Sequence, residues 1–307
     1  MDRVATLTLN PTIDSSCTAD RVFPTHKVRT RAQRHDPGGG GINVARVLAR
    51  LGCKVEVAYL AGGPTGALLD ELLDERGLER HRIAIAGDTR MSLAVFEHDT
   101  GKEFRFVPEG PLVTASEWGA ALEFCAGLDH GWLVASGSLP RGAPVDYYAR
   151  LARCAGSHHT RLVLDTSGPA LAAALDEGGL FLVKPSQGEF EALIGYKLTG
   201  PQAIGDAAMD FVRRGKARHV AVTLGHEGAV LAHAGGVVIR PGACVSVKSA
   251  TGAGDSFVAG MVHGFLAGED AAGAFAWGMA AGTAAVLTPG TGLCAPEDVR
   301  RLRAAAD

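Results

Sequence analysis

A short glycine-rich segment ends in an acidic residue just where a helix is predicted to begin. Gly252, Ala253 and Gly254 precede Asp255, and apolar residues at helical spacing follow over residues 258–265. Small residues before a helix leave backbone N–H groups uncovered, which suits the binding of a phosphate group. An aspartate beside such an anion hole is ionised at neutral pH and can accept a proton from a hydroxyl group. The same position also suits a carboxylate that only caps the helix and complements its dipole, so both interpretations stay open here.

A second glycine-rich segment precedes another predicted amphipathic helix. Residues 38–41 are all glycine, Ile42 and Asn43 follow, and apolar residues recur at helical spacing over residues 44–51. The uncovered N–H groups suit an anion or the hydroxyl groups of a sugar. Phosphoryl transfer needs donors around the moving phosphoryl group and a group that accepts the proton of the nucleophile. The two segments together therefore favour a phosphoryl-transfer site in which Asp255 is the base.

The composition is that of a globular protein without a basic excess for nucleic acid or a membrane surface. Of the 307 residues 47% are hydrophobic and 21% charged, and 30 basic against 33 acidic residues give a net charge of −3. We therefore expect no nucleic-acid or membrane partner. The longest uncharged run, residues 271–290, is too weakly apolar for a bilayer and predicts a buried helix. Scattered cysteines and the lack of a leader pattern predict a cytoplasmic protein, and no GxxxxGK(S/T) P-loop is present.

Short apolar runs that end in small or polar residues recur along the chain, with helical patterns between them. Continuous apolar strands alternating with helices predict a mainly parallel sheet covered on both faces, which is a three-layer α/β/α arrangement. Ligands bind beyond the carboxyl ends of the strands in such sheets. The polar and small residues that follow the predicted strands are Asn10, Ser136, Ser138, Asp165, Lys184, Thr223 and Gly225.

Two stretches break this alternation. Residues 15–34 are β-branched and basic, and residues 91–107 alternate around a central turn, so each predicts an antiparallel strand or hairpin. We expect them to form a small sheet that stands off the main one as a lid, over about residues 12–36 and 88–110 of a single domain spanning 1–307. Ordinary edge strands of one continuous sheet are the alternative.

At these residues the chain resembles the ribokinase-like (PfkB) sugar kinases over nearly its whole length. Residues 38–43 are similar to the family's N-terminal signature, Gly-Gly-x-Gly-x-Asn, and residues 250–257 are similar to its C-terminal signature. Two long signatures in the right order and spacing make the match specific. Residues 10–14 and 136–140 resemble the phosphosugar branch of the family. The resemblance implies a ribokinase-like fold with a β lid and a kinase that uses ATP and Mg²⁺.

The resemblance also implies a role for each site residue. Asp255 would deprotonate the acceptor hydroxyl beside an anion hole formed by Gly252, Ala253 and Gly254. The phosphosugar would be bound by Asp14, Lys27, Gly38, Gly39, Asn43, Arg90, Arg105 and Ser138. ATP would contact Lys184, Ser186, Thr223, Gly225, Gly228, Thr251 and Gly254, with the helix over residues 270–286 beside the adenine. Glu189 would order Mg²⁺ through water.

Two places depart from the family's usual pattern. Ser186 stands where the family motif Asn-x-x-Glu has its Asn, and the shorter side chain predicts weaker use of Mg²⁺. Thr288 and Gly292 replace an Asn and an Arg in a segment that can border a monovalent cation. With Ser249 and Thr251 this segment remains a candidate K⁺ site.

The resemblance favours fructose 6-phosphate as the substrate, phosphorylated at its 1-hydroxyl to give fructose 1,6-bisphosphate in glycolysis. Arg105 lies in a Phe-Arg-Phe-Val-Pro stretch similar to the fructose 6-phosphate kinases of the family, and Lys27 and Arg90 offer further cations for the sugar phosphate. Gly40 stands where the fructose 1-phosphate and tagatose 6-phosphate branches usually have Lys. The alternatives are a 1-phosphofructokinase, a tagatose-6-phosphate kinase, or a phosphosugar-binding regulator without catalysis. Lid strands have edges to protect, and lid-to-lid packing gives dimers in this branch of the family, so the resemblance implies a homodimer.

Overall fold

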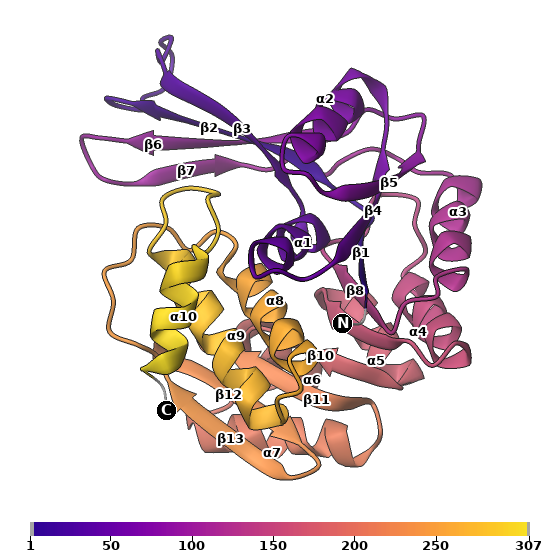
Figure 1. Cartoon of the computed structure of the whole chain (residues 1–307). Coiled ribbons are helices and arrows are strands. Elements are labelled where there is room, and N and C mark those ends of the chain that lie inside the picture. The colour runs from indigo at the N-terminus through magenta and orange to yellow at the C-terminus, as the bar shows by residue number, and fades with distance from the viewer. Residues whose placement is uncertain (1–2, 306–307) are drawn as a thin grey trace.

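A nine-stranded sheet runs through the middle of the computed structural model, which describes residues 3–305 (Figure 1). The strand order is β13-β12-β11-β10-β9-β8-β1-β4-β5, and every neighbouring pair from β11 to β5 is parallel. At one edge of the sheet, β12 pairs with β11 and β13 pairs with β12 in the antiparallel sense. The strands are β1 (Val4–Thr8), β4 (Val55–Ala61), β5 (Glu79–Ala84), β8 (Trp132–Ser136), β9 (Arg161–Asp165), β10 (Leu180–Val183), β11 (Ala217–Thr223), β12 (Gly228–His233) and β13 (Gly236–Pro241).

Helices cover both faces of this sheet, because successive strand residues point to opposite sides and both sides are apolar. Along β1, Val4 belongs to the core on one face, while Ala5 and Leu7 belong to the core on the other. The first face is covered by α1 (Gly40–Arg50), α2 (Gly63–Asp74), α8 (Ala253–Leu266), α9 (Ala271–Val286) and α10 (Pro296–Ala304). The second is covered by α3 (Ala115–Ala126), α4 (Tyr147–Ser157), α5 (Gly168–Glu177), α6 (Gln187–Ile194) and α7 (Gly200–Arg213). The predicted three-layer α/β/α fold is confirmed.

A separate four-stranded sheet stands off the main one, in the order β3-β2-β6-β7 (Figure 1). We call this sheet the lid sheet. Its strands are β2 (Thr12–Ala19), β3 (Arg31–Gly38), β6 (Arg90–Glu97) and β7 (Glu103–Phe106). The prediction of a separate small sheet is confirmed, and the alternative of edge strands in one continuous sheet is wrong.

The central pair of the lid sheet, β2 and β6, is parallel rather than antiparallel. The reason is the direction in which the chain enters the lid sheet. Strand β2 follows β1 and strand β6 follows β5, and both β1 and β5 run in the same direction in the main sheet. Both lid strands therefore leave the main sheet at the edge where its parallel strands end. The outer strands, β3 and β7, return as hairpin partners in the antiparallel sense, as predicted.

The uncharged run near the C-terminus lies mostly in α9, which packs against α8 in the core. Within residues 3–305, none of the helices combines the length and the apolar character needed to cross a bilayer.

Candidate active site

The residues predicted to do chemistry meet at the carboxyl ends of β8, β9 and β10, where ligands bind in parallel α/β sheets. A cavity of about 240 Å³ lies there, between these strand ends and the N-termini of α1 and α8. It is lined by Gly40, Ser136, Gly137, Ser138, Asp165, Thr166, Ser167, Glu189 and Asp255.

Asp255 sits in the first turn of α8, directly after the predicted anion hole. The helix begins after Gly252, whose φ of 73° lies in the left-handed region that glycine adopts without strain. The Asp255 carboxylate accepts a hydrogen bond from Nδ2 of Asn43 at 2.9 Å. Asn43 belongs to the other glycine-rich segment, so the fold joins the two predicted loops at the carboxylate.

The pKa of Asp255 is raised to about 7. Burial is the main cause, because the charged form loses water, and the nearby carboxylate of Asp165 adds to it. The hydrogen bond from Asn43 and the charge of Lys184 act in the opposite direction. The expectation that Asp255 is fully ionised at neutral pH is therefore wrong, because burial leaves it only partly ionised there. A carboxylate that titrates near neutral pH has the proton affinity that suits a general base.

Lys184, at the end of β10, places a buried cation beside the anion hole. Its Nζ lies 3.2 Å from Oδ1 of Asp165, and a Cβ built on Gly254 would lie only 3.5 Å from that Nζ. Burial alone would lower the pKa of Lys184, but the carboxylates of Asp165, Glu189 and Asp255 outweigh it, so the pKa is raised. Lys184 is therefore charged at neutral pH and faces the place predicted for the transferred phosphate.

Asp165 was not assigned a site role from the sequence, although it follows a predicted strand. Burial raises its pKa, and Lys184 partly offsets this. Its other oxygen accepts from the Ser136 hydroxyl at 3.5 Å. The polar residue at a strand end was the signal that could have marked it.

Ser186 and Glu189 open α6 in a reciprocal capping box. The Ser186 N–H donates to the Glu189 carboxylate at 2.7 Å, and the Glu189 N–H donates to the Ser186 hydroxyl at 3.4 Å. Glu189 also lines the cavity with Asp165 and Asp255, and carboxylate oxygens are the ligands that Mg²⁺ prefers. No three His, Cys, Asp or Glu side chains of residues 3–305 form a metal-binding cluster on their own.

The predicted sugar loop packs tightly on Asp14 of the lid sheet. A Cβ on Gly38 would lie 2.2 Å from Oδ2 of Asp14, and Gly39 has a φ of 108°. The Ser92 hydroxyl donates to the Asp14 carboxylate at 2.5 Å. Burial raises the pKa of Asp14, while Ser92 and the nearby Arg105 oppose this.

The cationic residues predicted for the sugar phosphate differ in their hydrogen bonding to the protein and in their exposure. Arg90 donates to the backbone carbonyls of Asn10, Pro11 and Pro108 at 2.8–3.3 Å. It thereby connects the loop after β1 with the chain that follows β7 of the lid sheet. Arg105 on β7 is nearly half exposed. Lys27 is exposed in the segment between β2 and β3.

The remaining predicted substrate and nucleotide residues border the same edge. Nδ2 of Asn10 donates to the exposed Ser138 hydroxyl at 3.2 Å. Thr223 ends β11, and its N–H donates to the Pro185 carbonyl at 3.1 Å, beside Lys184. The two predicted nucleotide-loop glycines, Gly225 and Gly228, have φ values of 62° and 114°.

The candidate K⁺ site is formed by two segments, one just before α8 and one just after α9. The Thr251 N–H donates to the Ser249 hydroxyl at 3.2 Å. Arg50 donates to the carbonyls of Gly292 and Cys294 at 2.7 and 3.1 Å, so a cationic side chain already contacts the segment after α9.

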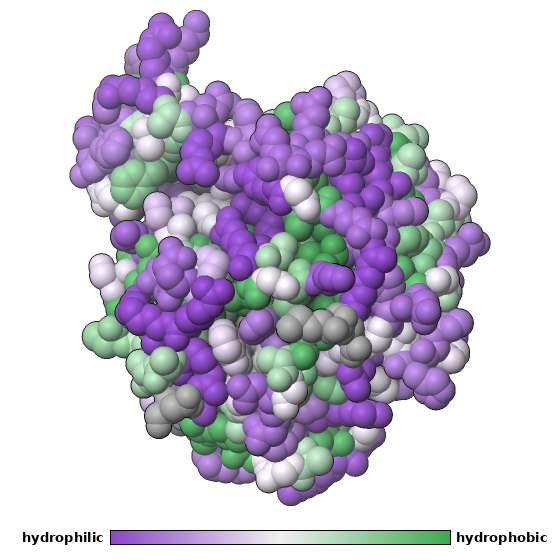
Figure 2. Space-filling view, in the orientation of Figure 1, coloured by the Kyte–Doolittle hydropathy of each residue, from purple (hydrophilic) through white to green (hydrophobic). Residues whose placement is uncertain are grey.

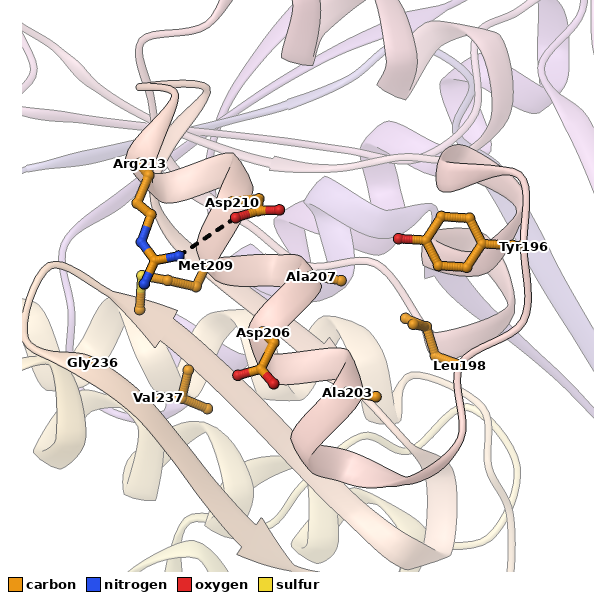
Figure 3. A pocket seen from close by; sticks show the side chains of 10 residues that line it. All are labelled: Tyr196, Leu198, Ala203, Asp206, Ala207, Met209, Asp210, Arg213, Gly236 and Val237. Atoms are coloured by element: carbon orange, nitrogen blue, oxygen red, sulfur yellow. Dashed lines mark ion pairs between the residues drawn. The ribbon is translucent and has the colours of Figure 1, made fainter.

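A larger, open groove of about 550 Å³ lies between α7 and β13 (Figure 3). Asp210 and Arg213 of α7 form an ion pair at 3.5 Å along its rim. None of the predicted catalytic or binding residues lines it. The smaller cavity is therefore the candidate active site, because the chemistry converges there.

The fold and this cavity define a phosphotransferase of the ribokinase-like class. The chain belongs to the pfkB family of carbohydrate kinases, whose family model matches residues 7–298. It is an ATP-dependent sugar kinase, as the resemblance implied, and ATP use in this family implies a divalent metal.

Similar proteins include phosphofructokinases of two kinds. The ATP-dependent 6-phosphofructokinase isozyme 2 of Mycobacterium tuberculosis is 41% identical over 302 residues, which cover 97% of this chain and 88% of that protein. The crystal structure of Escherichia coli phosphofructokinase-2 in complex with potassium is 36% identical, covers 99% of both chains and has a TM-score of 0.96. The same E. coli protein has been solved with fructose 6-phosphate and in a tetrameric inhibited form, each with a TM-score of 0.94. The 1-phosphofructokinase of Rhodobacter capsulatus is 35% identical over 275 residues, which cover 88% of this chain and 86% of that protein. These similarities support sugar-phosphate kinase activity.

Proposed function

We propose that this kinase transfers the terminal phosphoryl group of ATP to the 1-hydroxyl of fructose 6-phosphate, giving fructose 1,6-bisphosphate in glycolysis. The observation that carries the proposal is the contact between the two glycine-rich segments. Asn43 holds the Asp255 carboxylate at 2.9 Å, beside residues 252–254 and the buried ammonium of Lys184. A base that lines the cavity, with an anion hole and a cation next to it, supplies the parts that phosphoryl transfer requires.

In this proposal Asp255 takes the proton of the acceptor hydroxyl while the N–H groups of residues 252–254 bind the charge on the transferred phosphoryl. Lys184 compensates further charge on the ATP phosphates. Glu189 would hold Mg²⁺ through water, and the ion would neutralise phosphate charge when bound. The capping box leaves one Glu189 oxygen engaged with the Ser186 N–H, so the other is the one that can face the ion.

Two observations support the proposal of fructose 6-phosphate as the phosphosugar. The 6-phosphofructokinases of M. tuberculosis and E. coli are similar to this chain over nearly its full length. Gly40 also lies so close to the next loop that a Cβ there would come within 2.1 Å of the Ser136 hydroxyl. A Lys at position 40, usual in the alternative branches, would therefore require the Ser136–Gly137 loop to move. Asp14 and Asn43 would bind sugar hydroxyls, and Lys27 and Arg105 the sugar phosphate.

We further propose that the lid sheet closes over the cavity and joins two copies of the chain. Its strands expose apolar side chains, among them Phe96 and Phe106 at 39% and 56%, and apolar patches are visible on the lid sheet in Figure 2. A sheet with an exposed apolar face and free edges is a ready surface for pairing. A K⁺ ion near Ser249 and Thr251 and a cytoplasmic location remain part of the proposal.

The test is coupled release of ADP from ATP and Mg²⁺ with fructose 6-phosphate, fructose 1-phosphate and tagatose 6-phosphate, compared for the native protein and Asp255→Asn. We expect fructose 6-phosphate to give the highest kcat/KM, and the variant to lose about 10²-fold or more in kcat. A higher kcat/KM with another phosphosugar would refute the choice of substrate and leave the base in place. Binding of a phosphosugar without ADP release would identify a regulator instead.

A further inference from the structure

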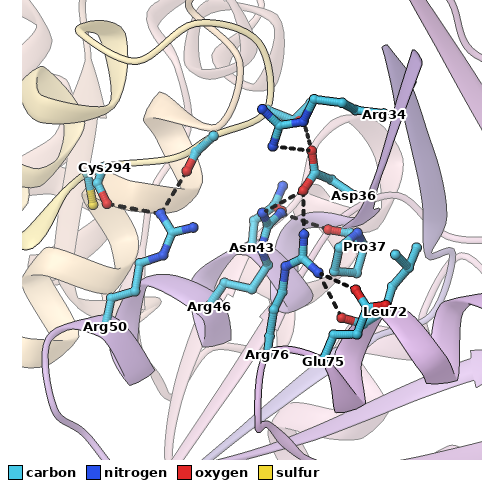
Figure 4. A network of polar contacts seen from close by, with 12 residues as sticks. Arg34, Asp36, Pro37, Asn43, Arg46, Arg50, Leu72, Glu75, Arg76 and Cys294 are labelled. Atoms are coloured by element: carbon cyan, nitrogen blue, oxygen red, sulfur yellow. Dashed lines mark hydrogen bonds and ion pairs between the residues drawn. The ribbon is translucent and has the colours of Figure 1, made fainter. Parts of the chain in front are cut away.

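Asn43 also contacts a buried arginine that does not line the cavity. Arg46 follows Asn43 by one turn of α1, and its side chain is only 2% exposed. Its Nη1 donates both to Oδ1 of Asn43 at 3.1 Å and to the carbonyl of Pro37 at 2.8 Å (Figure 4). Its Nη2 pairs with Oδ1 of Asp36 at 3.4 Å. One guanidinium group therefore contacts both the partner of the base and the residue that precedes the sugar loop.

Arg46 determines which end of the Asn43 amide faces the base. A guanidinium group only donates hydrogen bonds, so the amide oxygen must turn toward Arg46. The amide NH₂ then points the other way and donates to Asp255 at 2.9 Å. A flipped amide would place its oxygen against the Asp255 carboxylate, where two acceptors repel each other. Since an amide carries no net charge, its orientation depends on such neighbours.

The position of Arg46 is itself held by a buried carboxylate of the lid sheet. Asp36, on β3, is 3% exposed. It also accepts from Arg76 at 2.6 Å and from the Thr291 hydroxyl at 2.9 Å, and Arg34 lies 3.7 Å away (Figure 4). A buried arginine needs such a partner, because leaving either charge alone in the interior is costly.

We propose that Arg46 is a positioning residue for phosphoryl transfer. It orients the Asn43 amide toward Asp255 and holds the Pro37 carbonyl at the start of the sugar loop. Because Asp36 holds Arg46 in turn, strand β3 of the lid sheet is connected to the base. The inference rests on the proposed role of Asp255 as the base, and extends it to residues that contact no substrate.

The chain offers a matched pair of variants. Arg46→Lys keeps a positive charge but loses the fork that reaches Asn43, Pro37 and Asp36 together. Arg76→Lys changes another arginine on the same Asp36 oxygen, while its other hydrogen bond goes to the Leu72 carbonyl. Both variants weaken the network around Asp36, and only the first disturbs the Asn43 amide.

The experiment compares kcat, KM for fructose 6-phosphate, the pH profile of kcat and the melting temperature of the two variants. Loss of a hydrogen bond to a charged group should lower kcat of Arg46→Lys by about 10-fold or more. It should also move the acidic limb of its pH profile upward by about one pH unit, since the donor that favours ionised Asp255 is lost. The other charged groups facing Asp255 are Asp165, Lys184 and Asp14, which neither variant replaces. Arg76→Lys should lower the melting temperature by a similar amount. Its kcat and the position of its acidic limb should stay those of the native protein.

A double-mutant cycle with Asn43→Ala tests the route of the effect. If Arg46 acts through Asn43, Arg46→Lys causes little further loss of kcat in the Asn43→Ala protein. Should Arg46→Lys fail to fold, Arg46→Met combined with Asp36→Asn removes both buried charges, and the same loss of kcat and the same shift of the limb are expected.

Three outcomes would overturn the inference: equal kcat and pH profiles for Arg46→Lys and Arg76→Lys, fully additive losses in the cycle, or native kcat in the double variant. These outcomes are distinct from failure of the proposed function. An active Asp255→Asn protein would refute the role of Asp255 as the base. An inactive Asp255→Asn protein together with an Arg46→Lys protein of native kcat would refute only the positioning role of Arg46.

Discussion

The raised pKa of Asp255 predicts that this residue lowers the free energy of unfolding at neutral and alkaline pH. Its pKa is about 7 in the folded chain, against 3.8 for an unperturbed aspartate. Between these two pH values the unfolded chain has already released the proton that the folded chain still holds. Stability from Asp255 is therefore fully present below pH 3.8 and is lost as pH rises toward 7. Asp255→Asn removes this titration, so the variant should gain stability over the native protein as pH rises.

The magnitude follows from the shift of roughly three pKa units, each equivalent to about 1.4 kcal/mol, which sets an upper limit of about 4 kcal/mol. Asp255 is partly open to the cavity, so solvent screening reduces this value. We expect the Asn variant to exceed the native protein by about 2 kcal/mol at pH 8. For a chain of this size that is a rise of about 3 °C in melting temperature.

The assay is thermal unfolding of the two ligand-free proteins at intervals from pH 4.5 to 8. The difference in melting temperature should grow up to about pH 7 and then level off. Asp298→Asn is the control, since Asp298 stands in the first turn of α10 with an ion pair to Arg301 and does not line the active-site cavity. A difference between native and Asp255→Asn proteins that stays constant across this range would refute the argument that burial raises the pKa of the base.

Three more predictions concern catalysis. With fructose 6-phosphate, kcat/KM should rise with pH and reach half its maximum near pH 7, the pKa of Asp255; a flat profile from pH 5.5 to 8.5 would contradict this. Ser186→Asn should lower the Mg²⁺ concentration needed for half-maximal rate, and an unchanged Mg²⁺ titration would count against a weakened metal site. Gly38→Ala should raise KM for the sugar by about 10-fold or more, because its Cβ would meet the Asp14 carboxylate at 2.2 Å. An unchanged KM, with native melting temperature, would show that Asp14 does not bind the sugar.

Much of the fold follows from local patterns. The apolar runs at Val4–Thr8 and Leu180–Val183 form parallel strands, and the periodic segment after the four glycines forms α1. These predictions succeed because burial on both faces requires continuous apolar strands, and burial on one face requires helical spacing. The polar residues at strand ends could be placed on one edge for the same reason, since parallel strands all end there.

The sequence could not indicate the parallel pairing of β2 with β6. Their local patterns indicate strands, but pairing direction depends on where the chain leaves the main sheet. The role of Asp165 was missed on similar grounds. A lone aspartate after a strand is common, and only the fold brings Lys184 to 3.2 Å from it.

The amino-acid sequence by itself determined the chemical parts of this kinase: two glycine-rich helix starts, an aspartate after one of them and an asparagine after the other. Their joint action was decided by the tertiary structure, which brings Asn43 and Asp255 into contact across 212 residues of chain. It also buries Asp255 enough to raise its pKa to about 7, and sets Arg46 against Asp36. Proton affinity and amide orientation depend on burial and on neighbours distant in sequence, and these exist only once the sheet, the helices and the lid sheet have packed.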